Sequence, residues 1–340
     1  MAVGITDIFI RESAALAPLA GITGSVFRRI CVRFGARPVI TEMISADGFI
    51  RSKPGGMTSR LLRFHESERP IGFQFFGSDP DIMAEAARKS MELQPDFIDI
   101  NAGCPMKKII AKGSGAALLT SPELLRSIVE KVTSAVTVPL TVKIRSGWDH
   151  TSINAVEVAR LCEGAGANAI IIHPRVRSQG FSGAADWSII GAVKKAVAIS
   201  VIGSGDIRTP DDAATMLEQT GADAVMIGRR AMGDPDIFRR VAERLRGALV
   251  SEEPGIAERL ELALTHMNML ANEISERYAV LNMRKFFGWY SRGAHEGADF
   301  RRKVFRAGTI DDVRRIVRNF QAHVQEFENN YKPASEMVKS

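Results

Sequence analysis

A cysteine stands in the part of this sequence best suited to chemistry. Residues 97–100 form a short, mainly apolar run, which gives way directly to the loop 101–105, where Asn101 and Cys104 lie. Lys107 and Lys108 follow, and then a glycine-spaced stretch, 112–115. A thiol in a polar loop can act as an acid, a nucleophile or a packing residue. Its meaning therefore depends on which other side chains the fold brings beside it.

Short apolar runs rich in β-branched residues recur up to about residue 230. Between them lie stretches of helical periodicity, such as 80–93, 122–136, 153–165 and 210–220, several of which begin at a Ser, Thr or Asp able to cap a helix. The expected strands are residues 14–18, 38–41, 71–75, 97–100, 140–144, 169–172, 200–202 and 224–227. Apolar strands that alternate with amphipathic helices indicate a parallel sheet covered by helices.

Eight such units predict an α/β fold of the (β/α)8 TIM barrel type. An open doubly wound sheet is the alternative, but no GxGxxG sequence follows the first strand, which weakens a dinucleotide-binding version of it. After about Arg246 the strand signals end, and a linker at 251–255 leads into long helical periodicities. We therefore predict a barrel domain, residues 1–250, followed by a smaller all-α helical domain, residues 251–340.

Functional side chains of a TIM barrel collect at the carboxyl ends of its strands, so residues there belong to one site. The first six strands contribute Pro18, Glu42, Gln74, Asn101, Cys104, Lys143, His173, Arg175 and Arg177. The last two strands end in glycine-rich turns, 203–206 and 228–230, which can expose backbone N–H groups to a phosphate. Such a cradle suits a sugar phosphate or flavin mononucleotide (FMN).

The neighbouring polar residues favour the flavin. Lys143 lies within a strand, Gln74 lies two strands earlier, and His173 lies at the end of the next strand. The polar edge of a flavin ring needs hydrogen-bond donors and a positive charge, and these side chains supply both.

The expected helical domain carries the basic excess of the chain. Its segment 277–318 holds eleven Lys and Arg residues against four Asp and Glu, a net charge of +7, while the whole chain carries +6. Phe286, Phe287, Trp289 and Tyr290 are interleaved with that charge. These aromatic rings either stack on RNA bases beside phosphate contacts or form the core of a helical bundle, and both interpretations stay open.

Composition is that of an ordinary globular protein, with 45% hydrophobic and 25% charged residues. The sequence has neither a run of about 18 apolar residues nor a signal-peptide layout, so we expect a cytoplasmic protein without a membrane segment. Cys31, Cys104 and Cys162 are widely spaced and match neither a disulfide framework nor a zinc site. Reduced thiols and no bound metal are expected.

Taken together, these motifs resemble the bacterial tRNA-dihydrouridine synthases, most closely the B-type group. The similarity runs through residues 17–23, 101–105, 143–145, 173–177, 203–207 and 228–231, and it covers nearly the whole chain. The resemblance implies a flavin-binding barrel with noncovalent FMN, a helical tRNA-binding domain, and NADPH as electron donor. The implied reaction is reduction of a uridine in the tRNA D-loop to 5,6-dihydrouridine.

The resemblance also implies roles for individual residues. Cys104 is the implied proton donor, because a thiol with a reference pKa of about 8.5 is mostly protonated near neutrality yet can still release its proton. Cofactor contacts are implied for Ala17, Pro18, Leu19, Gln74, Lys143, His173, Gly203, Ser204, Gly205, Asp206, Gly228 and Arg229. Substrate contacts are implied for Asn101, Lys107, Arg175 and Arg177.

Two other functions stay open on the sequence alone. Another flavin enzyme of the same fold, such as a dihydroorotate dehydrogenase, also handles a pyrimidine ring, but it would not need the basic helical tail. A noncatalytic RNA-binding protein on a barrel scaffold would not need Cys104, Lys143 and both glycine turns.

Overall fold

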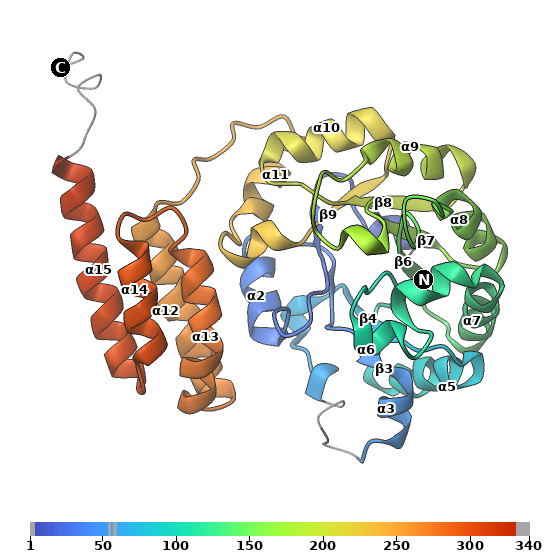
Figure 1. The fold of residues 1–340 in the computed structure, drawn as a ribbon, viewed down its shortest axis with the longest axis horizontal. Helices are drawn as coiled ribbons and strands as arrows, with labels where there is room; N and C mark the ends of the chain where they lie inside the picture. The colour runs from blue at the N-terminus through green and yellow to red at the C-terminus, as the bar shows by residue number, and fades with distance from the viewer. Residues whose placement is uncertain (1–3, 54–55, 57–59, 331–340) are drawn as a thin grey trace. The chain divides into compact units, whose positions relative to one another are not determined.

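A closed parallel barrel forms the centre of the computed structural model, which describes residues 4–53, 56 and 60–330 (Figure 1). The strands lie in the order β2-β1-β9-β8-β7-β6-β5-β4-β3, and pairing of β2 with β4 closes the sheet. Their bounds are β1 (Ala14–Leu16), β2 (Val39–Ile40), β3 (Ile44–Ser45), β4 (Ile71–Phe76), β5 (Phe97–Ala102), β6 (Leu140–Arg145), β7 (Ala169–His173), β8 (Ser200–Ser204) and β9 (Ala224–Ile227).

The predicted TIM barrel is confirmed, and its closure rules out the open doubly wound sheet. Each of the eight predicted strands forms at its expected place. The second position is divided between β2 and β3, which both run parallel to β4. The intervening residues, 41–43, leave the strand geometry, so Glu42 follows β2, as predicted, in a break of the barrel wall before β3.

Helices surround the strands, and capping residues define where several of them begin (Figure 1). Asp79 accepts hydrogen bonds from the N–H groups of Asp81 and Ile82 at the start of α5 (Pro80–Ser90). Thr209 accepts from Asp212 N at the start of α10 (Pro210–Thr220). Further helices around the strands are α1 (Ile5–Ile8), α2 (Ser25–Arg33), α3 (Ala46–Arg51), α6 (Lys107–Ile110), α7 (Pro122–Ala135), α8 (Ala155–Gly164), α9 (Trp187–Ala196) and α11 (Ile237–Leu245).

The interior of the barrel is apolar toward the amino ends of its strands. Ile8 and Phe9, at the end of α1, join a buried cluster with Phe97, and the rings of Phe9 and Phe97 meet edge to face at 5.5 Å. A methyl group on Gly72 would lie 2.3 Å from the Phe97 ring, so the bulk of that ring requires a glycine opposite it. Since alternate residues of a strand share a face, Asp99 and Asn101 follow Phe97 on the inner side and begin a polar layer.

Backbone contacts divide the chain into two units. The first runs to Gly228 and includes Ile237–Ser251, and the second holds Arg229–Asp236 and continues from Glu252. The second unit is helical, with α12 (Ile256–Glu273), α13 (Glu276–Tyr290), α14 (Gly297–Arg306) and α15 (Ile310–Asn330). Its buried core comprises Leu260, Met267, Met283, Phe287, Phe300, Val304 and Val317, among others.

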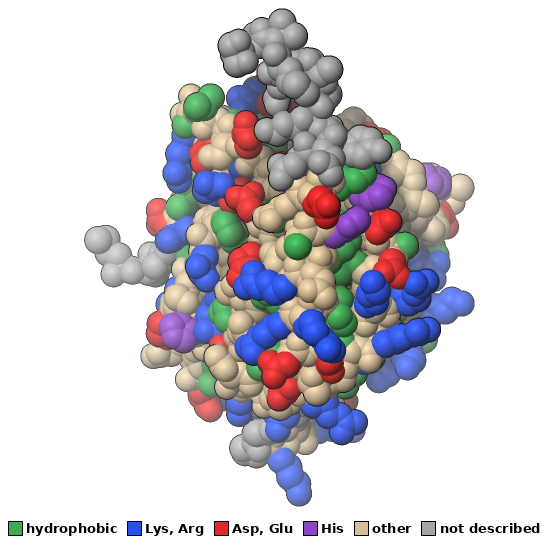
Figure 2. All heavy atoms as spheres, turned by 90° about the vertical axis from the view of Figure 1, so that its left-hand side faces the viewer, with side chains coloured by type: hydrophobic (Ala, Val, Ile, Leu, Met, Phe, Trp, Pro, Cys, Tyr) green, Lys and Arg blue, Asp and Glu red, His purple; other side chains and the backbone are tan. Residues whose placement is uncertain are grey.

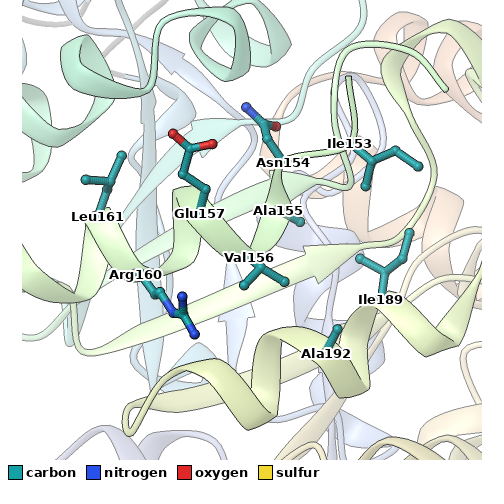
Figure 3. Close-up of a pocket in the computed structure, with 9 residues that line it drawn as sticks. All are labelled: Ile153, Asn154, Ala155, Val156, Glu157, Arg160, Leu161, Ile189 and Ala192. Atoms are coloured by element: carbon teal, nitrogen blue, oxygen red, sulfur yellow. The ribbon is translucent and has the colours of Figure 1, made fainter. Parts of the chain in front are cut away.

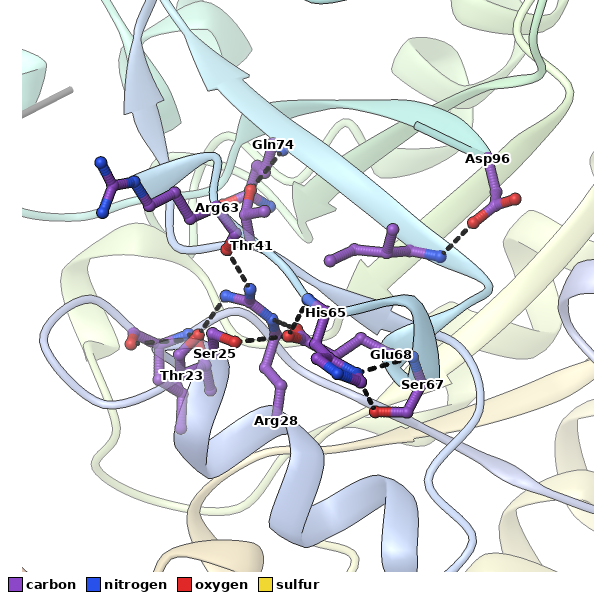
Figure 4. Close-up of polar contacts among 12 residues, drawn as sticks. Thr23, Ser25, Arg28, Thr41, Arg63, His65, Ser67, Glu68, Gln74 and Asp96 are labelled. Carbon is purple, nitrogen blue, oxygen red and sulfur yellow. Dashed lines mark hydrogen bonds and ion pairs between the residues drawn. The ribbon is translucent and has the colours of Figure 1, made fainter. Parts of the chain in front are cut away.

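A buried ion pair links α2 to the 3-10 turn η1 (Glu66–Glu68), as Figure 4 shows. Arg28 Nε lies 2.5 Å from Glu68 Oε2, and both side chains are almost fully buried. Arg28 also donates to the carbonyls of Thr23 (2.8 Å) and Arg63 (2.9 Å), while Glu68 accepts from His65 N (2.8 Å). Burial lowers the pKa of Arg28, and the charge of Glu68 opposes this.

This ion pair also holds the loop after β1. The hydroxyl of Thr23 accepts a hydrogen bond from Leu19 N at 2.9 Å, and the carbonyl of Thr23 is a partner of Arg28. The position of Pro18 and Leu19 therefore depends on Arg28 and Glu68, two residues that lie outside the strands.

We expect Glu68→Gln to lower the free energy of unfolding by about 3–5 kcal/mol, because it leaves the Arg28 guanidinium buried without a counter-charge. Chemical denaturation monitored by circular dichroism measures this. The matched control is Asp81→Asn, which removes an exposed ion pair with Lys131 and should change stability by less than about 1 kcal/mol. Equal effects of the two substitutions would contradict a structural role for the buried pair.

Candidate active site

Strand register brings predicted site residues from β4 to β7 to the same end of the barrel. Asn101 lies opposite Lys143, and Gln74 lies opposite Asp99. One step further along, Arg145 lies opposite His173. Gln74, Asn101 and His173 are buried, and Lys143 is half-buried. The sequence alone therefore identified side chains that the fold places together.

Cys104 lies in a loop that is held from both sides. Asn101 Oδ1 accepts hydrogen bonds from the N–H groups of Gly103 (3.1 Å) and Cys104 (2.9 Å). On the carbonyl side, Arg145 Nε donates to Gly103 O at 2.9 Å, and Ala116 N donates to Cys104 O at 3.0 Å. The half-buried thiol thus has a defined main-chain position at the end of β5.

Burial raises the pKa of the Cys104 thiol, and the Met106 N–H and the charge of Arg145 lower it less strongly. The thiol therefore carries its proton at neutral pH. That state suits a proton donor and does not suit a nucleophile, which reacts as the thiolate.

The ring of His173 lies against an arginine. Arg175 Nη1 lies 3.2 Å from His173 Nε2, and because a guanidinium can only donate, Nε2 must accept and the ring proton lies on Nδ1. Gly205, with φ of +119°, approaches the same ring so closely that a methyl group there would lie 2.8 Å from His173 Cδ2. The turn after β8 therefore requires glycine at this position.

Unpaired groups at this end of the barrel fit the flavin that the sequence suggested. The backbone N–H groups of Gly205 and Gly228 have no hydrogen-bond partner among the described residues, so they can donate to a phosphate. Within the same part of the chain, Lys143 Nζ makes neither a hydrogen bond nor an ion pair. Burial lowers the pKa of Lys143, while the Asp99 carboxylate opposes this. An amine in that setting can donate to the acceptors of a flavin ring.

Comparison with known proteins decides the family. A family model described as dihydrouridine synthase (Dus) matches residues 15–330. The chain is 38% identical to tRNA-dihydrouridine synthase B of Pseudomonas putida over 96% of this chain and 95% of that protein. It is 40% identical to the protein of that name from Pseudomonas aeruginosa over 91% of this chain and 93% of the relative. The chain belongs to the dihydrouridine synthase family.

Solved structures add the fold. Morphinone reductase aligns with a TM-score of 0.50 over 74% of this chain and 92% of its own, at 14% identity. A 6-hydroxypseudooxynicotine amine oxidase from Pseudomonas geniculata aligns with a TM-score of 0.52 over 71% of this chain and 50% of its own, also at 14% identity. At this identity the two matches show the shared barrel alone.

The structure gives Arg175 and Asp206, predicted to contact substrate and cofactor, a close partnership with each other. Arg175 is almost fully buried, and its Nη2 lies 2.7 Å from Asp206 Oδ2. The same guanidinium donates to the carbonyls of Ser182 (3.1 Å) and Gly183 (2.6 Å). A substrate contact by Arg175 stays a prediction, and in this arrangement the side chain instead ties the loop after β7 to the turn after β8.

Four further predicted residues lie at or next to the ends of β1, β8 and β9. Ala17 and Gly228 are neighbours, since a methyl group on Gly228 would lie 3.5 Å from Ala17 Cβ. A side chain on Gly203 would meet Met216 Sδ at 2.6 Å, so this glycine allows α10 to pack against β8, and the next residue, Ser204, is buried. Their predicted flavin contacts, like the other residue roles, stay predictions.

Three predicted basic residues lie outside the strands. Lys107 is exposed at the first position of α6. Arg177 lies in the 3-10 turn η4 (Arg177–Gln179), with its guanidinium carbon 4.2 Å from the centre of the Trp148 ring. Arg229 opens the 3-10 turn η5 (Arg229–Met232), which belongs to the second unit.

Sequence reasoning missed Arg145 as a member of the site. Its guanidinium contacts the Gly103, Val176 (3.0 Å) and Gly180 (2.9 Å) carbonyls and lies 5.7 Å from the ring centre of Phe181. It thereby joins the Cys104 loop to the loop after β7. Its position two residues after Lys143, on the same inward face of a strand, is the signal that could have identified it.

In the second unit the aromatic residues resolve into core and surface. Phe286, Phe287 and Tyr290 are buried, so the packing interpretation holds for them, and Trp289 is half-buried against Phe286. Exposed aromatic surface comes instead from Tyr278 and Phe305, which are 42% and 58% exposed. Stacking on RNA bases therefore has different candidates from the ones the sequence suggested.

Ion pairs neutralise part of the basic segment. Asp299 pairs with Arg302 and Lys303, Asp311 with Arg314, Asp312 with Arg315, and Glu261 with Arg318. On the face drawn in Figure 2, Asp and Glu side chains are scattered among more numerous Lys and Arg side chains. Arg277 and Arg306 are exposed and make no ion pair with a described residue, so they are the clearest candidates for phosphate contacts.

Two other features lie apart from the strand ends. A groove of about 610 Å³ runs between α8 and α9 on the outside of the barrel, lined by Ile153, Glu157, Arg160, Ile189 and Ala192 among others (Figure 3). Among the described residues, His295, Glu296 and His323 place one possible metal-ligating atom each within 4.8 Å of one another, although these side chains are largely open to solvent. None of the predicted site residues belongs to either feature.

No helix in the described part of the chain combines the length and the apolar character needed to cross a bilayer.

We expect the Arg175–Asp206 pair to make stability depend on pH in the acid range. Burial favours the neutral carboxyl, but the Arg175 hydrogen bond and Ala185 N–H outweigh it and hold the pKa of Asp206 below its ordinary value. A depressed folded-state pKa stabilises the protein above the unfolded-state pKa, and this stabilisation disappears as pH falls through the folded-state value. The stability gap between the wild-type protein and Asp206→Asn should therefore be full near neutrality and close in acid.

Denaturant titrations at several pH values measure that gap. Asp211→Asn, which removes an exposed carboxylate paired with Arg244, is the control and should show little gap at any pH. A wild-type advantage over Asp206→Asn that stayed constant into strong acid would contradict the assigned ionisation.

Proposed function

We propose that this protein is a tRNA-dihydrouridine synthase that reduces a uridine of the tRNA D-loop to 5,6-dihydrouridine, with FMN as cofactor and NADPH as electron donor. One observation supports it most strongly. Within a chain that matches the dihydrouridine synthase model over residues 15–330, a protonated thiol lies on a loop anchored to the same strand ends that offer unpaired donors to a flavin. Relatives named tRNA-dihydrouridine synthase B support tRNA as the substrate.

In this proposal the protein binds both the phosphate end and the ring end of the flavin. Gly205 and Gly228 donate backbone N–H groups to the phosphate, beside Ser204, Asp206 and Arg229. Gln74 and Lys143 contact the polar edge of the ring, His173 flanks it, and Ala17, Pro18 and Leu19 lie along its face. When bound, the reduced flavin supplies a hydride to carbon six of the uracil ring.

Cys104 supplies the proton. Its thiol donates to carbon five, where negative charge develops, and the burial that raises its pKa keeps the proton in place until then. Asn101, on the same strand end, orients the uracil, and Lys107 and Arg177 contact the surrounding phosphates. The guanidinium of Arg145, fixed on Gly103 O, stabilises the thiolate that remains.

In this proposal the helical unit binds the RNA. Protonating a ring carbon requires the base to leave its stack, which costs a few kcal/mol and favours an enzyme with a separate RNA-holding surface. The basic residues of segment 277–318 offer phosphate contacts, and the exposed rings of Tyr278 and Phe305 offer stacking surfaces.

We expect Cys104→Ala to abolish most dihydrouridine formation while the protein still binds flavin, because it removes the proton donor and no residue assigned to the cofactor. Dihydrouridine in tRNA transcripts and the flavin absorbance of the purified protein measure the two properties. Cys31→Ala is the control, since the Cys31 thiol, on α2, is fully buried in the protein core. Full turnover by Cys104→Ala would remove the thiol from the acid role.

We expect the double substitution Arg277→Ala and Arg306→Ala to weaken tRNA binding and to reduce the salt dependence of the affinity by about one unit of slope for each phosphate that these arginines neutralise. Binding titrations at several salt concentrations measure this. Lys131→Ala, an exposed lysine of α7 that pairs with Asp81, is the control and should leave the affinity unchanged. An unchanged salt slope in the double variant would show that these two arginines do not bind phosphate.

A further inference from the structure

We propose that Asp99 is a positioning residue that fixes the orientation of the Cys104 loop through the side-chain amides of Gln74 and Asn101. Asp99 lies on β5 below the candidate site and has no role in the chemistry described above. The effect on turnover rests on the proposed function, whereas the effect on the loop does not.

A continuous chain of hydrogen bonds connects Asp99 to the thiol-bearing loop. Asp99 is fully buried, and its Oδ2 accepts from Gln74 Nε2 at 2.6 Å. Gln74 Oε1 accepts from Asn101 Nδ2 at 2.9 Å. Asn101 Oδ1 then accepts from the N–H groups of Gly103 and Cys104 at 3.1 and 2.9 Å. Each polar atom of the two amides along this path thus has a partner.

The groups at the two ends of this hydrogen-bond path dictate the orientation of both side-chain amides. Both Asp99 oxygens accept in this structure, Oδ1 from Thr141 and Oδ2 from Gln74, so Gln74 turns its NH2 group toward Asp99 and its oxygen toward Asn101. Asn101 must then turn its own NH2 group toward Gln74, which leaves its oxygen for the loop. At the other end, two backbone N–H groups can only donate, so they require that oxygen. One arrangement satisfies every group.

Without an acceptor at position 99 the arrangement loses its direction. A reversed Gln74 would present NH2 to Asn101, and Asn101 would then have to choose between accepting from Gln74 and accepting from the loop. An Asn101 that turned its oxygen to Gln74 would place its own NH2 group against Gly103 and Cys104, donor against donor. The carbonyl-side contacts from Arg145 and Ala116 would remain, so the loop would shift rather than unfold.

Surrounding groups keep Asp99 able to accept. Burial raises the pKa of Asp99 to about 7, and the hydrogen bonds from Thr141 and Gln74 and the charge of Lys143 limit that rise. The Thr141 hydroxyl donates to the other carboxylate oxygen, Oδ1, which leaves Oδ2 for Gln74. The backbone N–H of Gln74 donates to Thr41 Oγ1 at 3.1 Å, so the strand itself stays fixed while the amide could turn (Figure 4).

The test compares variants that change the hydrogen bonds of Asp99 in different ways. Asp99→Leu removes the acceptor at similar volume. Asp99→Asn keeps an acceptor for Gln74, because its NH2 group can donate to Thr141 Oγ1, and it should preserve the orientation without the charge. Thr141→Val, at an equally buried position, removes a partner of Asp99 that does not lie on the path to the loop.

Alkylation of Cys104 by iodoacetamide in the purified, flavin-containing protein is the first measurement, read by mass spectrometry; Cys31 and Cys162 are fully buried and serve as internal references. Asp99→Leu should change the Cys104 rate by about threefold or more as the loop is released. It should also lower kcat for dihydrouridine formation about tenfold or more, since small displacements of a reacting group are costly. Asp99→Asn and Thr141→Val should stay within about twofold of the wild-type protein in both measurements.

An unchanged alkylation rate in Asp99→Leu, or an equal change in Thr141→Val, would overturn the proposal. If Asp99→Leu does not fold, Gln74→Met breaks the same path at its middle and should reproduce the altered alkylation; a wild-type rate there is equally decisive. A wild-type protein that forms no dihydrouridine would refute the proposed function, while the alkylation rates would still judge the role of Asp99.

Discussion

The carboxylate of Asp99, buried at the middle of the barrel, determines how the polar groups of the candidate site are arranged. Below Asp99 the interior is filled by apolar side chains, with Phe97 at the level of Ile8 and Phe9. Burying a carboxylate in such a setting is costly, and the hydrogen bonds of Thr141 and Gln74 and the charge of Lys143 offset part of that cost, although burial still raises the pKa of Asp99 to about 7. Thr141 and Gln74 lie beside Asp99 on the two neighbouring strands, and Lys143 lies two residues after Thr141. The need to satisfy one charge thereby organises the polar layer in which the candidate site lies.

Two ion pairs, one fully buried and one partly buried, extend this order to loops that strand register cannot fix. Arg28 and Glu68 hold the loop after β1 through Thr23, and Arg175 and Asp206 join the loop after β7 to the turn after β8. Each arginine also donates to main-chain carbonyls. Arginine suits this task, because its planar fork of donors satisfies several acceptors at once and cannot lose its charge.

Strands and helix starts followed from the sequence because they depend on local signals: apolar runs, capping residues and the spacing of glycine turns. The meeting of Gln74, Asn101, Lys143 and His173 followed as well, since parallel strands bring their carboxyl ends together. Partnerships between loops did not, because Arg175 carries the same charge whether it faces a phosphate or Asp206. Likewise, Phe286 and Tyr290 could be assigned to the core only once α13 had neighbours.

In the proposed function, the protonation state of the Cys104 thiol separates this site from those of cysteine nucleophiles. Enzymes that attack with sulfur lower the thiol pKa with a nearby positive charge or a helix N-terminus. Here Arg145 is close, but its guanidinium is fixed on the Gly103, Val176 and Gly180 carbonyls, and burial outweighs its influence on Cys104. The positive charge is thus near enough to stabilise sulfur after a proton has left and too weak to remove that proton beforehand. That balance fits the carbon-protonating acid that we propose.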